Sequence, residues 1–144
     1  MADKKQFKGR VEAIGTFNYI SDPVSVQAAT TLTKNQSGAA VLVVPPNDVI
    51  LPSASPAGQR FEFVLAADVS SGTSTVKTAG GNFIGGIATG NSAHKEQAPS
   101  PCNTATFTGA ANAGDRFECV SDGTNWYIVG GYCEEDDGLT FTNV

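Results

Sequence analysis

Hydrophobic and polar residues alternate in short segments along most of this chain, and glycine or proline interrupts the pattern every few residues. Residues 60–66 alternate most regularly, so their large apolar side chains lie on one side of a predicted strand. Residues 38–44 form a continuous apolar run that ends at Pro45 and Pro46, which predicts a strand buried on both faces. We find no segment with the apolar spacing of a helix, so the pattern favours strands.

Short strands separated by turn-forming residues are typical of all-β domains. We therefore predict an antiparallel β-sandwich or a jelly-roll-like barrel of about ten short strands. Residues 60–66 and 73–78 are candidates for a hairpin, and residues 91–103 are predicted to form a long surface loop. The predicted strands cover residues 11–20, 24–33, 38–44, 49–51, 60–66, 73–78, 80–90, 104–108, 116–121, 125–129 and 139–143.

One segment of the chain is repeated, because residues 57–64 match residues 113–120 at six of eight positions. A Gly-Thr pair and then a Gly-Gly pair follow each copy. We interpret the copies as two equivalent hairpins, in which Phe and Val point into the core while Arg and Glu point the other way. This interpretation predicts that the following side chains are mostly buried: Phe61, Phe63, Phe117, Val120 and Trp126.

The length of 144 residues and the hydrophobic fraction of 40 % suit one domain with its own core. Charge divides the chain into a basic N-terminal arm, residues 1–10, and a single β domain, residues 11–144, with an acidic segment at 134–137. The basic arm and the acidic segment are either solvated, with no partner, or involved in binding another protein surface. In the functional interpretation the arm docks on an acidic neighbour. The arm side chains available for such docking are Lys4, Lys5, Phe7, Lys8 and Arg10.

The overall charge of −5 argues against nucleic acid as a partner, because a nucleic-acid-binding domain must neutralise phosphates. The first residues contain neither a signal peptide nor an apolar span, so we expect synthesis in a cytoplasm and no membrane partner. Three cysteines cannot all pair within one chain. In a reducing compartment we expect Cys102, Cys119 and Cys133 to be partly buried thiols.

The search for catalytic and metal-binding patterns gives no site. His94 is the single histidine, and its neighbours Ser92 and Glu96 share the predicted loop, so we expect an exposed side chain rather than a fixed general base. Residues 85–92 have the glycine spacing of a phosphate-binding loop, but Asn91 stands where lysine is needed. The acidic segment is either a solvated turn or a casual divalent-ion site. We therefore predict a non-enzymatic protein with no catalytic residue, no cofactor and no structural metal.

Carbohydrate binding remains an alternative, because all-β domains often bind sugars on exposed aromatic rings. Trp126 and Tyr127 are adjacent in a predicted strand and therefore point to opposite faces. We expect Trp126 to lie in the core or at a subunit contact. The aromatic candidates for a sugar platform are Phe17, Tyr19, Trp126, Tyr127 and Tyr132.

Five short motifs between residues 30 and 131, taken in their order along the chain, resemble those of a known class of proteins. They are Thr31-Leu32-Thr33, Val49-Ile50-Leu51-Pro52, Ala57-Gly58-Gln59-Arg60-Phe61-Glu62-Phe63, Gly114-Asp115-Arg116 and Ser121-Asp122-Gly123-Thr124-Asn125-Trp126-Tyr127. Together they resemble small structural proteins of tailed bacteriophages, both head decoration (cement) proteins and tail-associated proteins. In such proteins the last motif looks like a tight Asp-Gly hairpin followed by a strand that returns its aromatic residue to the sheet. The basic arm and the acidic segment are not part of this pattern.

This resemblance implies a virion structural protein. The favoured interpretation is a capsid decoration protein that binds the outer surface of the phage head and stabilises contacts between coat subunits. Its expected partners are the major capsid protein and copies of itself. Because icosahedral shells have three-fold positions, we expect a homotrimer. The alternative is a tail-fibre or tail-associated recognition module, including one that binds carbohydrate.

Overall fold

The computed structural model describes residues 22–85, 87–89, 95–97 and 101–144, and for residues 87–89 and 95–97 it describes the backbone. The basic arm, the predicted strand at residues 11–20 and His94 lie outside the described residues. Among the described residues no helix is long and apolar enough to cross a membrane.

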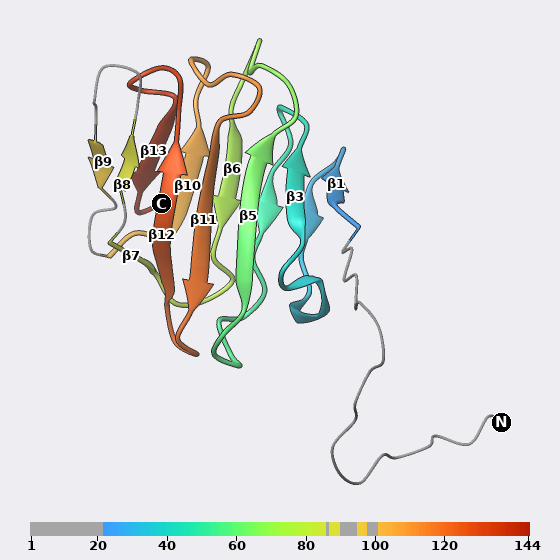
Figure 1. Ribbon diagram of the computed structural model, residues 1–144, viewed down its shortest axis with the longest axis vertical. Helices are drawn as coiled ribbons and strands as arrows, with labels where there is room; N and C mark the ends of the chain where they lie inside the picture. The colour runs from blue at the N-terminus through green and yellow to red at the C-terminus, as the bar shows by residue number, and fades with distance from the viewer. Residues whose placement is uncertain (1–21, 86, 90–94, 98–100) are drawn as a thin grey trace, which may run out of the picture.

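Two β-sheets pack against each other, as Figure 1 shows. The larger sheet has eight strands in the order β1-β3-β5-β11-β12-β8-β9, and β7 also pairs with β12. The smaller sheet has five strands in the order β13-β10-β6-β4-β2. The strands of the larger sheet are β1 (Val24–Val26), β3 (Ala40–Val43), β5 (Arg60–Leu65), β7 (Phe83–Ile84), β8 (Ile87–Thr89), β9 (Lys95–Gln97), β11 (Arg116–Ser121) and β12 (Trp126–Tyr132). Those of the smaller sheet are β2 (Thr30–Thr31), β4 (Val49–Ile50), β6 (Ser74–Lys77), β10 (Thr104–Phe107) and β13 (Leu139–Thr142). The prediction of an all-β, sandwich-like fold is confirmed.

The first six strands are wound between the two sheets. The chain alternates from β1 in the larger sheet to β2 in the smaller one, and so on to β6. Strands that are neighbours within one sheet therefore run in the same direction, and β1–β3, β3–β5, β2–β4 and β4–β6 are all parallel pairs. A single 3-10 turn, Lys34–Gln36, lies in the connection from β2 to β3.

The later strands pair mainly in the opposite sense. Strand β11 is antiparallel to both β5 and β12, and β10 is antiparallel to both β6 and β13. Both sheets are therefore mixed, and the prediction of a purely antiparallel sandwich is wrong. The alternation of apolar and polar residues is the same in parallel and antiparallel strands, so this pattern carried no information about direction.

The predicted hairpin between residues 60–66 and 73–78 does not form. Strand β5 belongs to the larger sheet and β6 to the smaller one. The connection of residues 66–73 passes over the end of the sandwich, where Val69 is buried and its amide donates a hydrogen bond to the carbonyl of Ala111 at 3.0 Å. This anchored connection leads the chain to the opposite sheet instead of returning it to the same one.

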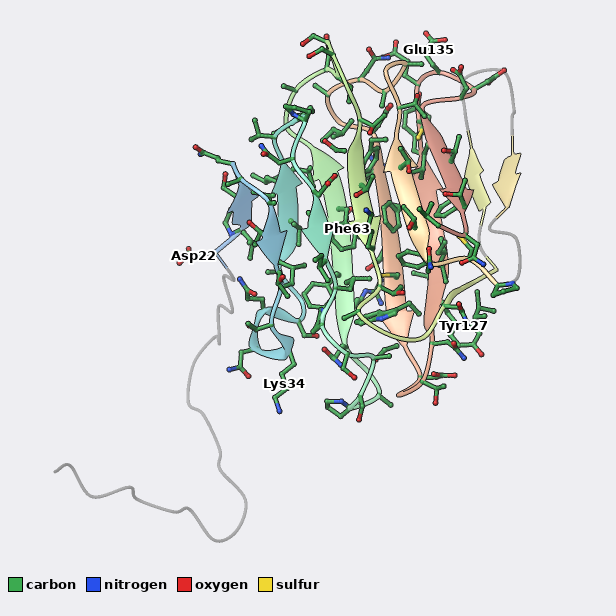
Figure 2. The ribbon with its side chains drawn as sticks, turned by 180° about the vertical axis from the view of Figure 1, so that it is seen from behind. Asp22, Lys34, Phe63, Tyr127 and Glu135 are labelled. Carbon is green, nitrogen blue, oxygen red and sulfur yellow. The ribbon has the colours of Figure 1, made fainter. Side chains whose placement is uncertain are left out.

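Aromatic rings fill the space between the sheets, and Figure 2 shows Phe63 in the middle of the molecule. The ring centroid of Phe117 lies 5.0 Å from that of Phe63 and 5.9 Å from those of Phe107 and Phe141. Phe61, Phe63, Phe117 and Trp126 are fully buried as predicted.

Val120 is partly exposed, which contradicts the prediction. It lies three residues after Phe117, so the two-residue period of a strand places it on the outer face together with Glu118. Residues 38–44 are also not buried on both faces. In β3 Val41 and Val43 are buried while Ala40 and Leu42 are partly exposed, because the second sheet covers only one face.

Candidate interaction face

The repeated segments lie side by side in the larger sheet. Strands β5 and β11 pair with Phe63 opposite Phe117, Glu62 opposite Glu118, and Arg60 opposite Val120. A local two-fold axis between the two glutamates therefore relates the copies. The interpretation of two equivalent hairpins is correct only for the second copy, since β11 turns back into β12 whereas β5 does not.

Two arginines and two glutamates form a charged group at the centre of the outer surface of the larger sheet. Like charges directly across a sheet repel, but each glutamate here has a diagonal arginine neighbour. Arg60 Nε donates a hydrogen bond to Glu118 Oε1, and this contact raises the pKa of Arg60. On the other diagonal, Arg116 Nε lies 4.0 Å from Glu62 Oε1. The local two-fold axis thus relates two equivalent ion pairs, each between an arginine of one copy and a glutamate of the other. The pair of Arg60 and Glu118 is the shorter of the two.

Arg116 has a second contact, with the ring of Tyr132. The residues are direct cross-strand partners, and the Arg116 guanidinium carbon lies 5.9 Å from the ring centroid. This distance is within the range of a cation–π contact. Arg116 is therefore shared between Glu62 and the aromatic ring, which accounts for the looser ion pair.

A β-bulge places two tyrosines on the same face. Cys119 pairs with Ile128 and Glu118 pairs with Gly130, so Val129 is the extra residue. Without the bulge Tyr127 and Tyr132, five residues apart, would point to opposite faces. Both tyrosines are instead opposite outward residues of β11, and each is 42 % exposed. Sequence reasoning named both residues as aromatic candidates but gave no sign that they share a face.

A shallow hollow adjoins the charged group. It has a volume of about 260 Å³, and the small residues of the segment 38–40 line one side of it. Arg60, Glu62 and Glu118 line the rest. The ion pairs, the hollow and the exposed side chains of β12 form one surface, which we call the interaction face. Its residues are Arg60, Glu62, Arg116, Glu118, Tyr127, Val129 and Tyr132.

The acidic segment folds around a buried carboxylate at one end of the sandwich, where Figure 2 labels Glu135. Asp115 is buried, and its two oxygens accept hydrogen bonds from the amides of Glu134, at 2.8 Å, and Asn112, at 2.9 Å. Among the residues that the structure describes, no group of three His, Cys, Asp or Glu side chains is arranged to hold a metal ion. The start of the acidic segment is therefore held by Asp115, the first residue before β11.

All three cysteines are buried as thiols. Burial raises the pKa of Cys119, with a smaller contribution from Glu118. Burial and then the carboxylate of Asp115 raise the pKa of Cys133 to about 12. Both thiols are therefore protonated at neutral pH and unsuited to act as nucleophiles.

The predicted Asp-Gly hairpin is present between β11 and β12. Asp122 Oδ1 accepts hydrogen bonds from the amides of Asn125 at 2.7 Å and Thr124 at 2.8 Å, which lowers the pKa of Asp122. Gly123 has φ of +98°, a conformation that glycine adopts without strain. The turn thus fixes the start of β12 and, with it, the position of Tyr127.

The arm residues proposed for partner binding, Lys4, Lys5, Phe7, Lys8 and Arg10, lie outside the described residues. The interaction face is the site that the described residues themselves provide. No protein-family model, no curated protein and no solved structure matches this chain.

Proposed function

We propose that the protein is a non-enzymatic virion component that decorates the outer surface of a phage head and stabilises contacts between coat subunits. One observation carries the proposal beyond the sequence resemblance. The interaction face presents exposed tyrosines and ion-paired arginines on a rigid sheet, and Tyr and Arg are the residue types that dominate protein–protein contacts.

The mechanism of a decoration protein is binding energy alone. A protein that binds the assembled shell but not its separated subunits stabilises the shell by mass action, as any ligand of a native state does. In this proposal the interaction face supplies the specific contacts. The basic arm speeds encounter with an acidic coat surface, because charge steers association. The protein would be made in the host cytoplasm and act on the capsid, with the major capsid protein and copies of itself as partners.

A second candidate function is carbohydrate recognition in a tail-associated protein. The observation that favours it is the placement of Tyr127 and Tyr132 on one face, with Gly130 between them and open space above this glycine. Sugar rings stack on exposed aromatic side chains, while neighbouring charged groups such as Glu118 accept hydrogen bonds from hydroxyl groups.

Cosedimentation with phage heads that lack the protein tests the first proposal. We expect the Tyr127→Ala/Tyr132→Ala double variant to bind heads at least about tenfold more weakly, the loss expected for two contact residues worth over 1 kcal/mol. The control variant is Ile50→Ala, which removes an exposed apolar side chain from the other sheet. Deleting residues 2–8 should weaken binding at low salt and have less effect at high salt, because salt screens exposed charges.

Equal binding by the double variant and the control would refute the role of the interaction face. Equal binding by the intact and truncated chains would show that the arm is a solvated tail. Retardation of the intact chain, but not of the double variant, in gels that contain soluble polysaccharides would instead support the carbohydrate alternative.

A further inference from the structure

Strand β1 forms one margin of the larger sheet, and among the described residues its only strand partner is β3 (Figure 1). The carbonyl of Val26 accepts a hydrogen bond from the amide of Val44 at 3.0 Å, so the backbone groups of Val26 face β3. Adjacent residues of a strand direct these groups to opposite sides. Ser25 therefore points its amide and carbonyl away from the sheet, where they form a template for another strand.

Among the described residues, the smaller sheet is also open at this margin, because β2 pairs only with β4. The amides of Thr30 and Leu32 donate hydrogen bonds to the carbonyls of Asp48 and Ile50 at 3.0 and 2.8 Å. The backbone of Thr31, between them, therefore points outward from β2. The wound part of the fold thus begins with an open edge in each sheet, as a stack of repeats does where no capping unit covers it.

The chain itself contains a candidate for this edge. Residues 11–20 precede β1 and lie outside the described residues, and their alternating sequence predicts a strand. One side of such a strand would carry Val11, Ala13, Phe17 and Tyr19, whereas the other side is mainly polar. This side resembles the apolar faces of the strands that form the core.

Local geometry argues against pairing of this segment with β1 of the same copy. That pairing needs a tight turn at residues 21–23, because Val24 already belongs to β1. Asp22 precedes Pro23, and a residue before proline avoids the helical region that the first central residue of a type I turn adopts. Pro23 cannot begin the turn either, because the next residue, Val24, is extended. Asp22 and Pro23 therefore disfavour a type I turn that would return the segment to the edge of its own copy.

We propose that residues 11–20 of one copy add as a strand to the open edge of β1 in a second copy. Each copy then donates one strand and accepts one, so the exchange links copies head to tail. Charge favours the exchange: the whole chain carries −5 and residues 1–10 carry +3, so residues 11–144 carry −8. The exchange takes place without any capsid and does not depend on the proposed virion function.

Ser25→Pro tests the acceptor edge. Proline at this position removes the outward amide, and the inward hydrogen bonds of Val26 remain. The control is Ser25→Ala, which keeps the amide. By light scattering after size exclusion, we expect the intact chain and Ser25→Ala to be oligomers. Ser25→Pro should have the mass of one chain, 14.8 kDa, with an unchanged circular dichroism spectrum.

Phe17→Pro and deletion of residues 2–20 test the donor strand, and both changes lie outside the described domain. Either one should also yield single chains. A mixture of the deletion variant, which keeps an open edge, with Ser25→Pro, which keeps the strand, should form a one-to-one pair. A monomeric intact chain would overturn the proposal, as would oligomers that persist in the deletion variant. If Ser25→Pro fails to fold, the donor variants alone decide.

Discussion

Strands β5 and β11 begin with the same Arg-Phe-Glu sequence, and in both the phenylalanine is buried while the arginine is exposed. Their surroundings differ after the strand ends. From β5 the chain crosses to the smaller sheet, and from β11 it returns as β12 beside its own copy. The same local sequence thus gives the same strand in two different topologies.

The connections explain the difference. Residues 66–73 contain the buried Val69, which anchors the chain over the end of the sandwich. Residues 122–125 instead contain Asp122 and Gly123, whose hydrogen bonds and backbone conformation close a tight turn. The comparison shows that strand sequence set the burial pattern, whereas the chemistry of the connection set which sheet received the next strand.

The positions at which the copies differ are equally informative. Gln59 and Asp115 are equivalent, and both are buried polar side chains next to a loop. Gln59 Nε2 donates to the carbonyls of Ser53 and Pro56, whereas Asp115 accepts from backbone amides at the opposite end of the copy pair. The side-chain amide of Gln59 donates to backbone carbonyls of its loop, and the carboxylate of Asp115 accepts from backbone amides of its loop. The residue in each copy therefore matches the backbone groups of the loop beside it.

The largest effect that we expect is from truncating the buried rings of the two copies. Phe61→Ala and Phe117→Ala should each lower the free energy of unfolding by about 3–5 kcal/mol, because each leaves a cavity in the core. Phe117 should be at the upper end, since its ring centroid lies 5.0 to 6.1 Å from those of four other phenylalanines. Urea denaturation measures both. A loss no larger than that of the control Val120→Ala would show that the ring is not in the core.

We expect a smaller effect on stability from the tight turn that follows the second copy. This turn contains Asp122, which has no counterpart in the longer connection after β5. The folded state lowers the pKa of Asp122, so the stabilisation by this carboxylate is complete above its unfolded pKa of about 3.9 and is lost as the pH falls through the folded value. The difference in stability between the intact chain and Asp122→Ala should therefore be full at neutral pH and shrink below about pH 4. Thermal unfolding across this range measures it.

The control for this experiment is Asp122→Asn, which keeps an oxygen acceptor at every pH. Its stability relative to Asp122→Ala should not depend on pH in the acid range. A difference between the intact chain and Asp122→Ala that stays constant down to pH values well below 3.9 would contradict the role of the ionised carboxylate.

The smallest effect should come from the two exposed ion pairs. Glu118→Gln should lower the melting temperature slightly more than Glu62→Gln, because Glu118 accepts a hydrogen bond from Arg60 whereas Glu62 lies 4.0 Å from Arg116. These variants leave the contact between Arg116 and Tyr132 in place. Both losses should be small and should diminish in high salt, since water and ions screen exposed pairs. Melting curves at low and high salt measure both losses, and a larger loss for Glu62→Gln would reverse the assigned order.

Most strand positions and the principal buried residues were predictable from the sequence, but β9 lies within residues 91–103, which were predicted to form a surface loop. Phe61, Phe63 and Phe117 were identified because alternation in a strand depends on neighbouring residues alone. The Asp-Gly hairpin was also predictable, since its hydrogen bonds join residues at most three apart. Val120 was misplaced because hydrophobicity was given more weight than the two-residue period.

The interaction face was not predictable to the same degree. Arg60 and Glu118 are 58 residues apart in the chain, and the repeat gave no sign that its copies pair with each other. Tyr127 and Tyr132 share a face because of a bulge at Val129, and the only sequence signal for this bulge is the pair of glycines that follows it within the strand. Both features depend on the alignment of β11 with its two neighbours.

The amino-acid sequence thus specified most of the strands and most of the side chains that face the core, because both depend on the local order of apolar and polar residues. The parallel winding of β1 to β6, the pairing of the two copies and the composition of the exposed face were fixed only when distant strands came together. Main-chain hydrogen bonds join the strands, and these bonds are the same whichever side chains the residues carry. Partner and direction were therefore determined by the connections and by packing of the whole core.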